Sequence, residues 1–332
     1  MGRLIGILLI VASLVAGWYW SAYQTFLQAP LNLPEDGLVL TVTPGSNLRQ
    51  ISAELAQQGV LSEPEFLYWH ARWKQLAHRI RAGEYQVIAG SKPDDLLNLL
   101  VSGKTISYSL TLLEGWNFKQ VMAAVRKNGV LKQELDGLDD EQIMRELGYP
   151  GIHPEGRFFP ETYSFPRGTS DIDFLKRAYR KMQQELDAAW AGRNKDSIMV
   201  KNKEEALILA SIIEKETGVP DERPEIAGVF SRRLKIGMKL QTDPTVIYGM
   251  GDRYKGNIRR SDLREDTPYN TYVHKGLTPT PICMPGRAAL DAALNPKPGK
   301  SLYFVSRGDG THVFSETLKQ HNAAVRKYQL KK

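Results

Sequence analysis

The sequence predicts an α+β protein with an N-terminal transmembrane helix, a small βααβ module and a larger mixed α/β domain built around one central helix. An uncharged apolar run follows Arg3, one strand-and-helix pattern occurs twice, and a long apolar helix lies in the second half of the chain. At 332 residues the chain is too long for one ordinary core. The predicted parts are an anchor at 1–22, a linker at 23–37, the module at 38–103 and the large domain at 104–332.

The anchor is predicted from hydrophobicity and charge. Residues 4–17 carry no charge, and Trp18, Tyr19 and Trp20 extend the apolar run to about 17 residues, the short end of the length that spans a bilayer. Aromatic residues at its outer edge are typical of the membrane interface, and after Arg3 no basic residue occurs before residue 49. This asymmetry predicts a cytoplasmic N-terminus and places the rest of the chain outside the cytoplasm. A cleaved signal peptide is the alternative, but no A-x-A-like cleavage site is found.

Charge and composition limit the kinds of partner and cofactor that the chain is expected to bind. The formal net charge of +7 suits anionic lipid or an acidic wall polymer as well as nucleic acid. Because the anchor places the large domain outside the cytoplasm, we expect no nucleic-acid partner. The six histidines have no metal-ligand spacing, so we expect no metal and no cofactor. The single cysteine, Cys283, allows no intramolecular disulfide.

The module at 38–103 is predicted from alternating strand and helix patterns. Its expected elements are a strand at 38–42, a helix with Leu48, Ile51 and Leu55 on one face, a helix at 63–77, a strand at 82–88 and a short helix after Pro93. This order resembles a LysM module, a small fold that binds the N-acetylglucosamine-containing glycan of cell walls. A plain α+β spacer is the alternative.

The large domain opens with a strand-helix unit, 106–131, that repeats 36–61. Residues 40–61 align without gaps to 110–131 and match at Leu, Thr, Gly, Asn, Gln, Ala, Gly, Val and Leu. So many matches in one ungapped window indicate that one supersecondary unit is used twice.

A helical region is predicted from 133 to 200, interrupted by the segment EGRFFPETYSFPRG at 155–168. Its aromatic residues are too dense for an ordinary exposed loop. They either fill a core or line a groove, and a sugar-binding groove uses aromatic faces for stacking. Core packing is the safer prediction for any one of them. The aromatic residues are Phe158, Phe159, Tyr163 and Phe165.

The helix predicted at 203–217 ends before a glycine and a proline. At about 100° per residue, Leu209 and Ile213 lie on one apolar stripe that Glu216 joins, whereas Glu214 points the other way. A carboxyl in an apolar stripe is costly to ionise, so its pKa rises and it can donate a proton near neutral pH, as a glycosidase acid must. The alternative is that the helix has left the core by residue 216 and that this glutamate is solvated.

The blocks around and after this helix carry a family resemblance. They read SIIEKETG, VFSRRLKIGMKLQTDPTVIYGMG, TPYNTY, GLTPTPICMPG and SLYFVSRGDGTHVFSETLKQHN. Together they resemble the MltG (YceG-like) family of endolytic murein transglycosylases, and the match extends from the anchor to the C-terminus. The resemblance implies a single-pass inner-membrane protein with a periplasmic LysM-like region and catalytic domain. It also implies that the second Glu of E-K-E-T, Glu216, is catalytic.

The implied reaction breaks the β-1,4 bond between N-acetylmuramic acid and N-acetylglucosamine within a strand. Glu216 protonates the bridging oxygen and then takes the proton from the muramic acid 6-hydroxyl as it closes on C1, which leaves a 1,6-anhydro end. No water is consumed, so one carboxylate can suffice where most hydrolases need two.

Other polar residues are expected to surround the oxocarbenium-like transition state. Asp-Pro and Tyr-Asn are also common in turns, so these residues have an ordinary structural explanation as well. The substrate-binding candidates are Glu161, Tyr163, Gln241, Thr242, Asp243, Tyr248, Tyr269, Asn270 and Tyr272.

The expected partners are glycan strands, the membrane and peptidoglycan synthases, because a tethered enzyme that cuts within strands would limit the length of new ones. Two other functions are compatible with the sequence. One is a hydrolytic muramidase with Asp243 or Glu161 as second carboxylate. The other is a non-enzymatic wall-binding scaffold in which Glu216 is structural.

Overall fold

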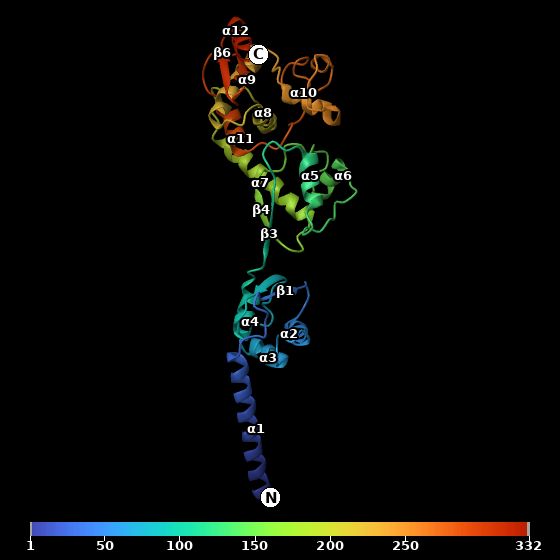
Figure 1. The fold of residues 1–332 in the computed structure, drawn as a ribbon, viewed down its shortest axis with the longest axis vertical. Helices are drawn as coiled ribbons and strands as arrows, with labels where there is room; N and C mark the ends of the chain where they lie inside the picture. The colour runs from blue at the N-terminus through green and yellow to red at the C-terminus, as the bar shows by residue number, and fades with distance from the viewer. Residues whose placement is uncertain (1, 331–332) are drawn as a thin grey trace. The chain divides into compact units, whose positions relative to one another are not determined.

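The computed structural model describes residues 2–330 and comprises two units, each with its own hydrophobic core (Figure 1). The first unit is Met1–Tyr108 with Ser164–Gly168, and the second is Ser109–Tyr163 with Thr169–Lys332.

Helix α1 (Gly2–Gln28) is long and apolar enough to cross a membrane. Its 26-residue candidate span reaches roughly 39 Å at 1.5 Å per residue, compared with roughly 30 Å for a bilayer core. The helix continues six residues past the predicted end of the anchor, so the linker expected at 23–37 is helical in its first part. The reason is packing, because Phe26 and Leu31 are buried in the core of the first unit.

The first unit has the predicted order of strand, helix, helix, strand. Strand β1 (Leu38–Val42) pairs antiparallel with β2 (Gly83–Val87), in a register that sets Leu40 opposite Tyr85. Helix α3 ends at Trp73 rather than at 77, because Gln75 has a φ of +58°, in the left-handed region that an α-helix cannot contain. The helices are α2 (Leu48–Gln57), α3 (Pro64–Trp73) and α4 (Pro93–Ser102).

The repeated sequence forms the same local structure twice. Helix α5 (Phe118–Lys127) follows β3 (Ser107–Thr111) as α2 follows β1. Asn47 and Asn117 cap the two helices in the same way, each in a capping box with the glutamine three residues later. The strands differ in their partners, since β3 pairs with β4 (Thr162–Pro166) and not with a strand of the first copy.

The second unit is built around α8 (Lys203–Glu216), which packs against α7, α9, α10 and α11 (Figure 1). Residues 206–213 of α8 are all buried, so this helix is enclosed and has no single apolar stripe. The other elements are α6 (Asp140–Glu146), α7 (Asp171–Ala191), α9 (Arg223–Lys235), α10 (Asp243–Met250), α11 (Arg287–Leu294), the antiparallel hairpin of β5 (Tyr303–Ser306) and β6 (His312–Ser315), α12 (Leu318–Tyr328), and 3₁₀ turns at Pro220–Glu222, Gly251–Arg253 and Asp262–Arg264.

Candidate active site

Glu216 is the last residue of α8. The helix is capped at its start by Asn202, whose side chain accepts a 2.8 Å hydrogen bond from the backbone N–H of Glu205. It ends because Thr217 adopts an extended conformation, with φ −144° and ψ 137°. The carboxyl group therefore stands where an enclosed helix leaves the core, one residue before the predicted helix end at 217.

The surroundings of Glu216 favour its protonated form. Burial raises the pKa of its carboxyl from 4.5 to about 7, and the negative charge of Asp243 acts in the same direction. A hydrogen bond from the hydroxyl of Thr242 opposes this shift, because it stabilises the carboxylate. Glu216 can thus hold a proton near neutral pH and still release it.

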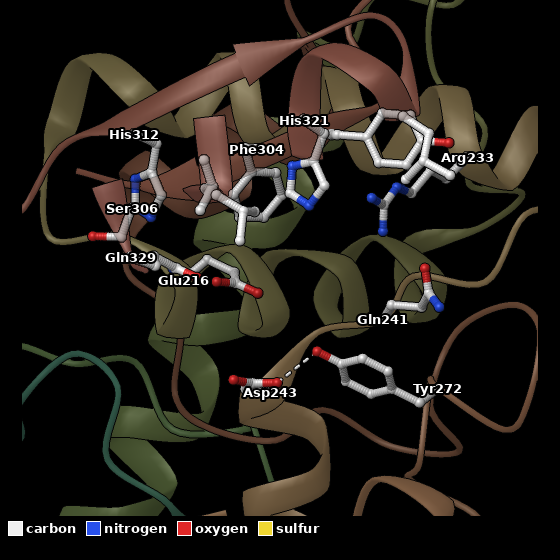
Figure 2. Close-up of a pocket in the computed structure, with 14 residues that line it drawn as sticks. Glu216, Arg233, Gln241, Asp243, Tyr272, Phe304, Ser306, His312, His321 and Gln329 are labelled. Atoms are coloured by element: carbon white, nitrogen blue, oxygen red, sulfur yellow. Dashed lines mark hydrogen bonds between the residues drawn. The ribbon is translucent and has the colours of Figure 1, made fainter. Parts of the chain in front are cut away.

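A cavity of about 400 Å³ lies beside Glu216. The predicted residues Gln241, Asp243 and Tyr272 line it (Figure 2). The hydroxyl of Tyr272 donates a 2.6 Å hydrogen bond to Asp243, which fixes both side chains. Gln241 has a φ of +49°, an unfavourable conformation for a residue with a side chain and one that is concentrated at functional sites.

The β5–β6 hairpin and α12 also line this cavity, with residues that the sequence did not indicate. His312 is held by Glu222, which accepts a 2.7 Å hydrogen bond from the His312 backbone N–H and lies 2.7 Å from its ring Nδ1. His312 stands in a family-like block, but its spacing to other polar residues gives no sign of a role. The further lining residues here are Tyr303, Phe304, Val305, Ser306, Leu318, His321, Val325 and Gln329.

Arg233 of α9 places a positive charge in the same cavity (Figure 2). Its Nε donates a 2.6 Å hydrogen bond to the carbonyl of Leu302, and its Nη1 donates one of 2.5 Å to the carbonyl of Leu240. Burial lowers the pKa of this guanidinium. Arg233 therefore joins the hairpin to the loop that carries Gln241 while facing the cavity.

Glu214 is unsuited to the role of proton donor. Its carboxylate pairs with Arg223 at 3.2 Å and accepts a 3.0 Å hydrogen bond from the backbone N–H of Gly286. The premise of a single apolar stripe is wrong, because residues 206–213 of α8 are buried on every face and the side chain of Glu214 is itself buried beside Arg223. What distinguishes Glu216 from Glu214 is its access to a cavity.

A second cavity, of about 550 Å³, contains another buried carboxyl, Glu155. Glu155 accepts hydrogen bonds from the backbone N–H of Phe118 at 3.0 Å and from the hydroxyl of Tyr248 at 3.1 Å. Burial raises the pKa of Glu155 to about 7. The predicted candidates Tyr248 and Tyr269 line this cavity and not the one beside Glu216. Glu155 was missed because a single Glu before a glycine has no helical or strand periodicity to mark it.

Four of the predicted candidates line neither cavity, and of these only Thr242 contacts Glu216. Tyr163 is buried and donates its hydroxyl to the carbonyl of Phe159 at 2.7 Å, and with Glu161 it borders a separate cavity of about 370 Å³. Asn270 is buried and donates to the carbonyls of Asp262 and Glu265, so it shapes a loop. The four aromatic residues at 158–165 are all buried, as the core-packing prediction required.

Comparisons with known proteins agree with the sequence blocks. Residues 40–327 match the model of the YceG-like family. The chain is 34% identical over 307 residues to an endolytic murein transglycosylase of Bacillus subtilis, covering 87% of this chain and 84% of that protein. It is 26% identical over 357 residues to an endolytic murein transglycosylase of Streptococcus pneumoniae, covering 97% of this chain and 64% of that one.

A solved structure has a similar fold. The crystal structure of a yceG-like protein from Listeria monocytogenes matches with a TM-score of 0.52 and 28% identity, over 87% of this chain and 99% of that one. The family model covers far more than half of the chain, and both sequence and fold agree with it. This chain is therefore a member of the YceG-like family.

Proposed function

We propose that this chain is an endolytic murein transglycosylase in which Glu216 acts as general acid and then as general base. The observation that carries the proposal is a carboxyl with a pKa of about 7 that borders a cavity of about 400 Å³. Acid–base catalysis is most efficient when the pKa of the group lies near the working pH. The names of the relatives from Bacillus subtilis and Streptococcus pneumoniae support the same activity.

The reaction needs two proton transfers, one from Glu216 and one back to it. Glu216 gives its proton to the oxygen that links muramic acid C1 to the next sugar, and that bond breaks. The 6-hydroxyl then bonds to C1 as its proton passes to the Glu216 carboxylate. The products are a free 4-hydroxyl and a 1,6-anhydro end, and Glu216 is protonated again. Asp243, held by Tyr272, supplies negative charge to the oxocarbenium-like transition state.

The glycan strand occupies the cavity beside Glu216 and the cavity that contains Glu155. Lys215 and Glu216 are neighbours at the end of α8 and line different cavities, as do Asp243 and Pro244 at the start of α10. A strand that is cut internally must continue on both sides of the broken bond. The rings in the second cavity, which include Tyr248, offer stacking faces for sugars.

A hydrolytic muramidase is the second candidate function, and one observation favours it. Asp243 lines the same cavity as Glu216, so a second carboxylate is present that could activate water. Glu161 does not line that cavity and is no longer a candidate for this role.

The anchor places the enzyme at the membrane. The charge asymmetry around α1 supports a cytoplasmic N-terminus and a periplasmic catalytic unit. The βααβ module acts as a LysM-like unit that binds glycan, which its order of strand, helix, helix and strand supports. Tethering beside peptidoglycan synthases would let the enzyme limit the length of new strands.

Mass spectrometry of purified glycan strands tests the activity. Strands are incubated with the full chain in detergent, with Glu216→Gln, and with Glu161→Gln as the matched carboxyl control. The expected result is internal fragments one water lighter than hydrolysis products, formed by wild type and Glu161→Gln but not by Glu216→Gln. Hydrated ends would establish the hydrolase instead. Folded wild-type protein that cuts nothing would favour the scaffold.

A further inference from the structure

Helix α3 of the first unit packs against the outer end of α1. The ring of Phe66 contacts three aromatic rings of α1, with centroid distances of 6.3 Å to Tyr19, 5.9 Å to Tyr23 and 5.7 Å to Phe26. The hydroxyl of Tyr23 also lies 2.5 Å from Nδ1 of His70. Tyr19 lies one residue before Trp20, the last residue of the apolar run of α1, so α3 lies beside the point at which that run ends.

The face of α3 that points away from its own core is aromatic. Leu67 is 0% exposed in the core, whereas Trp69 is 55% exposed and Trp73 is 74% exposed. At about 100° per residue, Trp69 is on the opposite side of the helix from Leu67, and Trp73 lies next to it one turn further on. Two largely exposed tryptophans on one turn are unusual, because this side chain gains free energy when it leaves water.

The depth of this face fits the headgroup layer of a bilayer. Tryptophan is enriched at the level where hydrocarbon gives way to headgroups, and that is the level of Trp18, Tyr19 and Trp20 on α1. In Figure 1, α3 lies at the edge of the first unit that is nearest to the apolar part of α1. The core of the unit is on the other side of α3.

The charge on this face suits the same layer. The guanidinium of Arg72 stands 5.6 Å from the ring of Trp69 and is exposed. An arginine that rests on an aromatic ring keeps its donors free for phosphate oxygens, while the ring enters the less polar side. An exposed tryptophan beside an arginine can therefore bind phospholipid headgroups, with the arginine on the phosphates and the ring below them.

We propose that α3 lies in the headgroup layer of the bilayer that α1 crosses, with Trp69 and Trp73 inserted at the interface and Arg72 on lipid phosphates. The proposal rests on the proposed function, in which α1 anchors the chain in the membrane. It makes the first unit a module that lies on the membrane rather than one that swings on a flexible linker.

Spin labels on the full chain test this placement. Single cysteines replace Trp69, Trp73, Leu8 in α1 and Val39 in β1, and each labelled protein is reconstituted into vesicles of phosphatidylcholine and phosphatidylglycerol. Native Cys283 is buried, and the unsubstituted chain controls for its labelling. Relaxation by dissolved oxygen, which concentrates in lipid, is compared with relaxation by a water-soluble nickel complex.

The expected result is an oxygen-to-nickel ratio at positions 69 and 73 that is several-fold higher than at 39 and lower than at 8. If the oxygen-to-nickel ratio at positions 69 and 73 equals that at position 39 while position 8 is in lipid, α1 is anchored but this proposal is overturned. The proposal would also be overturned if a protein partner covered this face in cells. If position 8 is also in water, the anchoring itself fails.

A label-free measurement checks the same proposal. Lipids brominated near the headgroup end of their chains quench tryptophans at the interface. Quenching should fall in the Trp69→Phe, Trp73→Phe double variant relative to wild type, while Trp18 and Trp20 continue to report the anchor. An unchanged quenched fraction would overturn the proposal.

Discussion

At the scale of single residues, the site depends on where two carboxyls are buried. Glu216 and Glu155 both have a pKa near 7 because burial disfavours their charge, but each borders its own cavity. Glu216 could be selected from the sequence as the catalytic candidate, because it lies at the end of an apolar helix and in a recognisable motif. Glu155, His312 and Arg233 could not, since only tertiary packing brings them to a cavity.

The pH dependence of cleavage should follow the neighbours of Glu216. Its carboxyl must be protonated to start the reaction, so kcat/KM should fall as the pH rises above about 7. Asp243 raises this pKa and Thr242 lowers it. Asp243→Asn should therefore move the alkaline limb to lower pH, and Thr242→Val should move it to higher pH. If both variants shifted the alkaline limb of the pH profile in the same direction, a group other than Glu216 would control that limb.

Glu155 should make the stability of the protein depend on pH. Its pKa is raised from 4.5 to about 7 in the folded state, so its contribution to stability is present below pH 4.5 and is lost as the pH rises toward 7. Glu155→Gln removes the charge and should gain up to about 3 kcal/mol in unfolding free energy relative to wild type between pH 4 and pH 8. Urea titrations of both proteins measure this gap. A difference in unfolding free energy between the two proteins that does not change with pH would contradict this prediction.

At the scale of elements, the sequence predicts the bounds of a strand or helix when nearby residues determine where it begins and ends. Strand β1, helix α2 and the end of α8 follow from their periodicity and caps. The extent of α3 could not be predicted, because a left-handed residue at Gln75 stops it without a glycine or proline. The pairing of β3 with β4 could not be predicted either, since it joins segments about fifty residues apart in the sequence.

The repeated capping boxes give an element-scale prediction. Asn117→Ala removes the side chain that accepts from the backbone N–H of Gln120 at 2.9 Å, and Asn47→Ala does the same at Gln50. Each change should cost about 1 kcal/mol. Calorimetry should show that each variant lowers the transition of its own unit, because Asn47 and Asn117 belong to different units. A shift of both transitions together would mean that the units unfold as one.

At the scale of the whole molecule, one chain joins a helix long enough to cross a membrane to the unit that contains the candidate active site. The fold class and the family could be predicted from the sequence, because the apolar run and several long blocks are continuous in it. The walls of the cavity beside Glu216 could be predicted only in part. Gln241 and Tyr272 were among the candidates, whereas His312 and Arg233 come from separate segments that reach this cavity only in the folded second unit.

Tethering should decide where the enzyme acts in cells. When residues 1–22 are exchanged for a cleaved signal peptide, the released protein should shorten new glycan strands less than the anchored protein at equal abundance. Strand lengths are measured by chromatography of glycans freed from their peptides. Equal distributions for both forms would contradict a role for the membrane in limiting strand length.

The position of Glu216 as the final residue of α8 has an electrostatic consequence. Aligned peptide dipoles give the C-terminal end of a helix a partial negative charge of about half an electron. That charge opposes ionisation of the carboxyl, in addition to burial. In the proposed reaction the same fixed field would face a sugar ring that becomes positive, and it would attract that charge without having to reorganise. The helix that carries Glu216 would then contribute its own backbone to the stabilisation of the transition state.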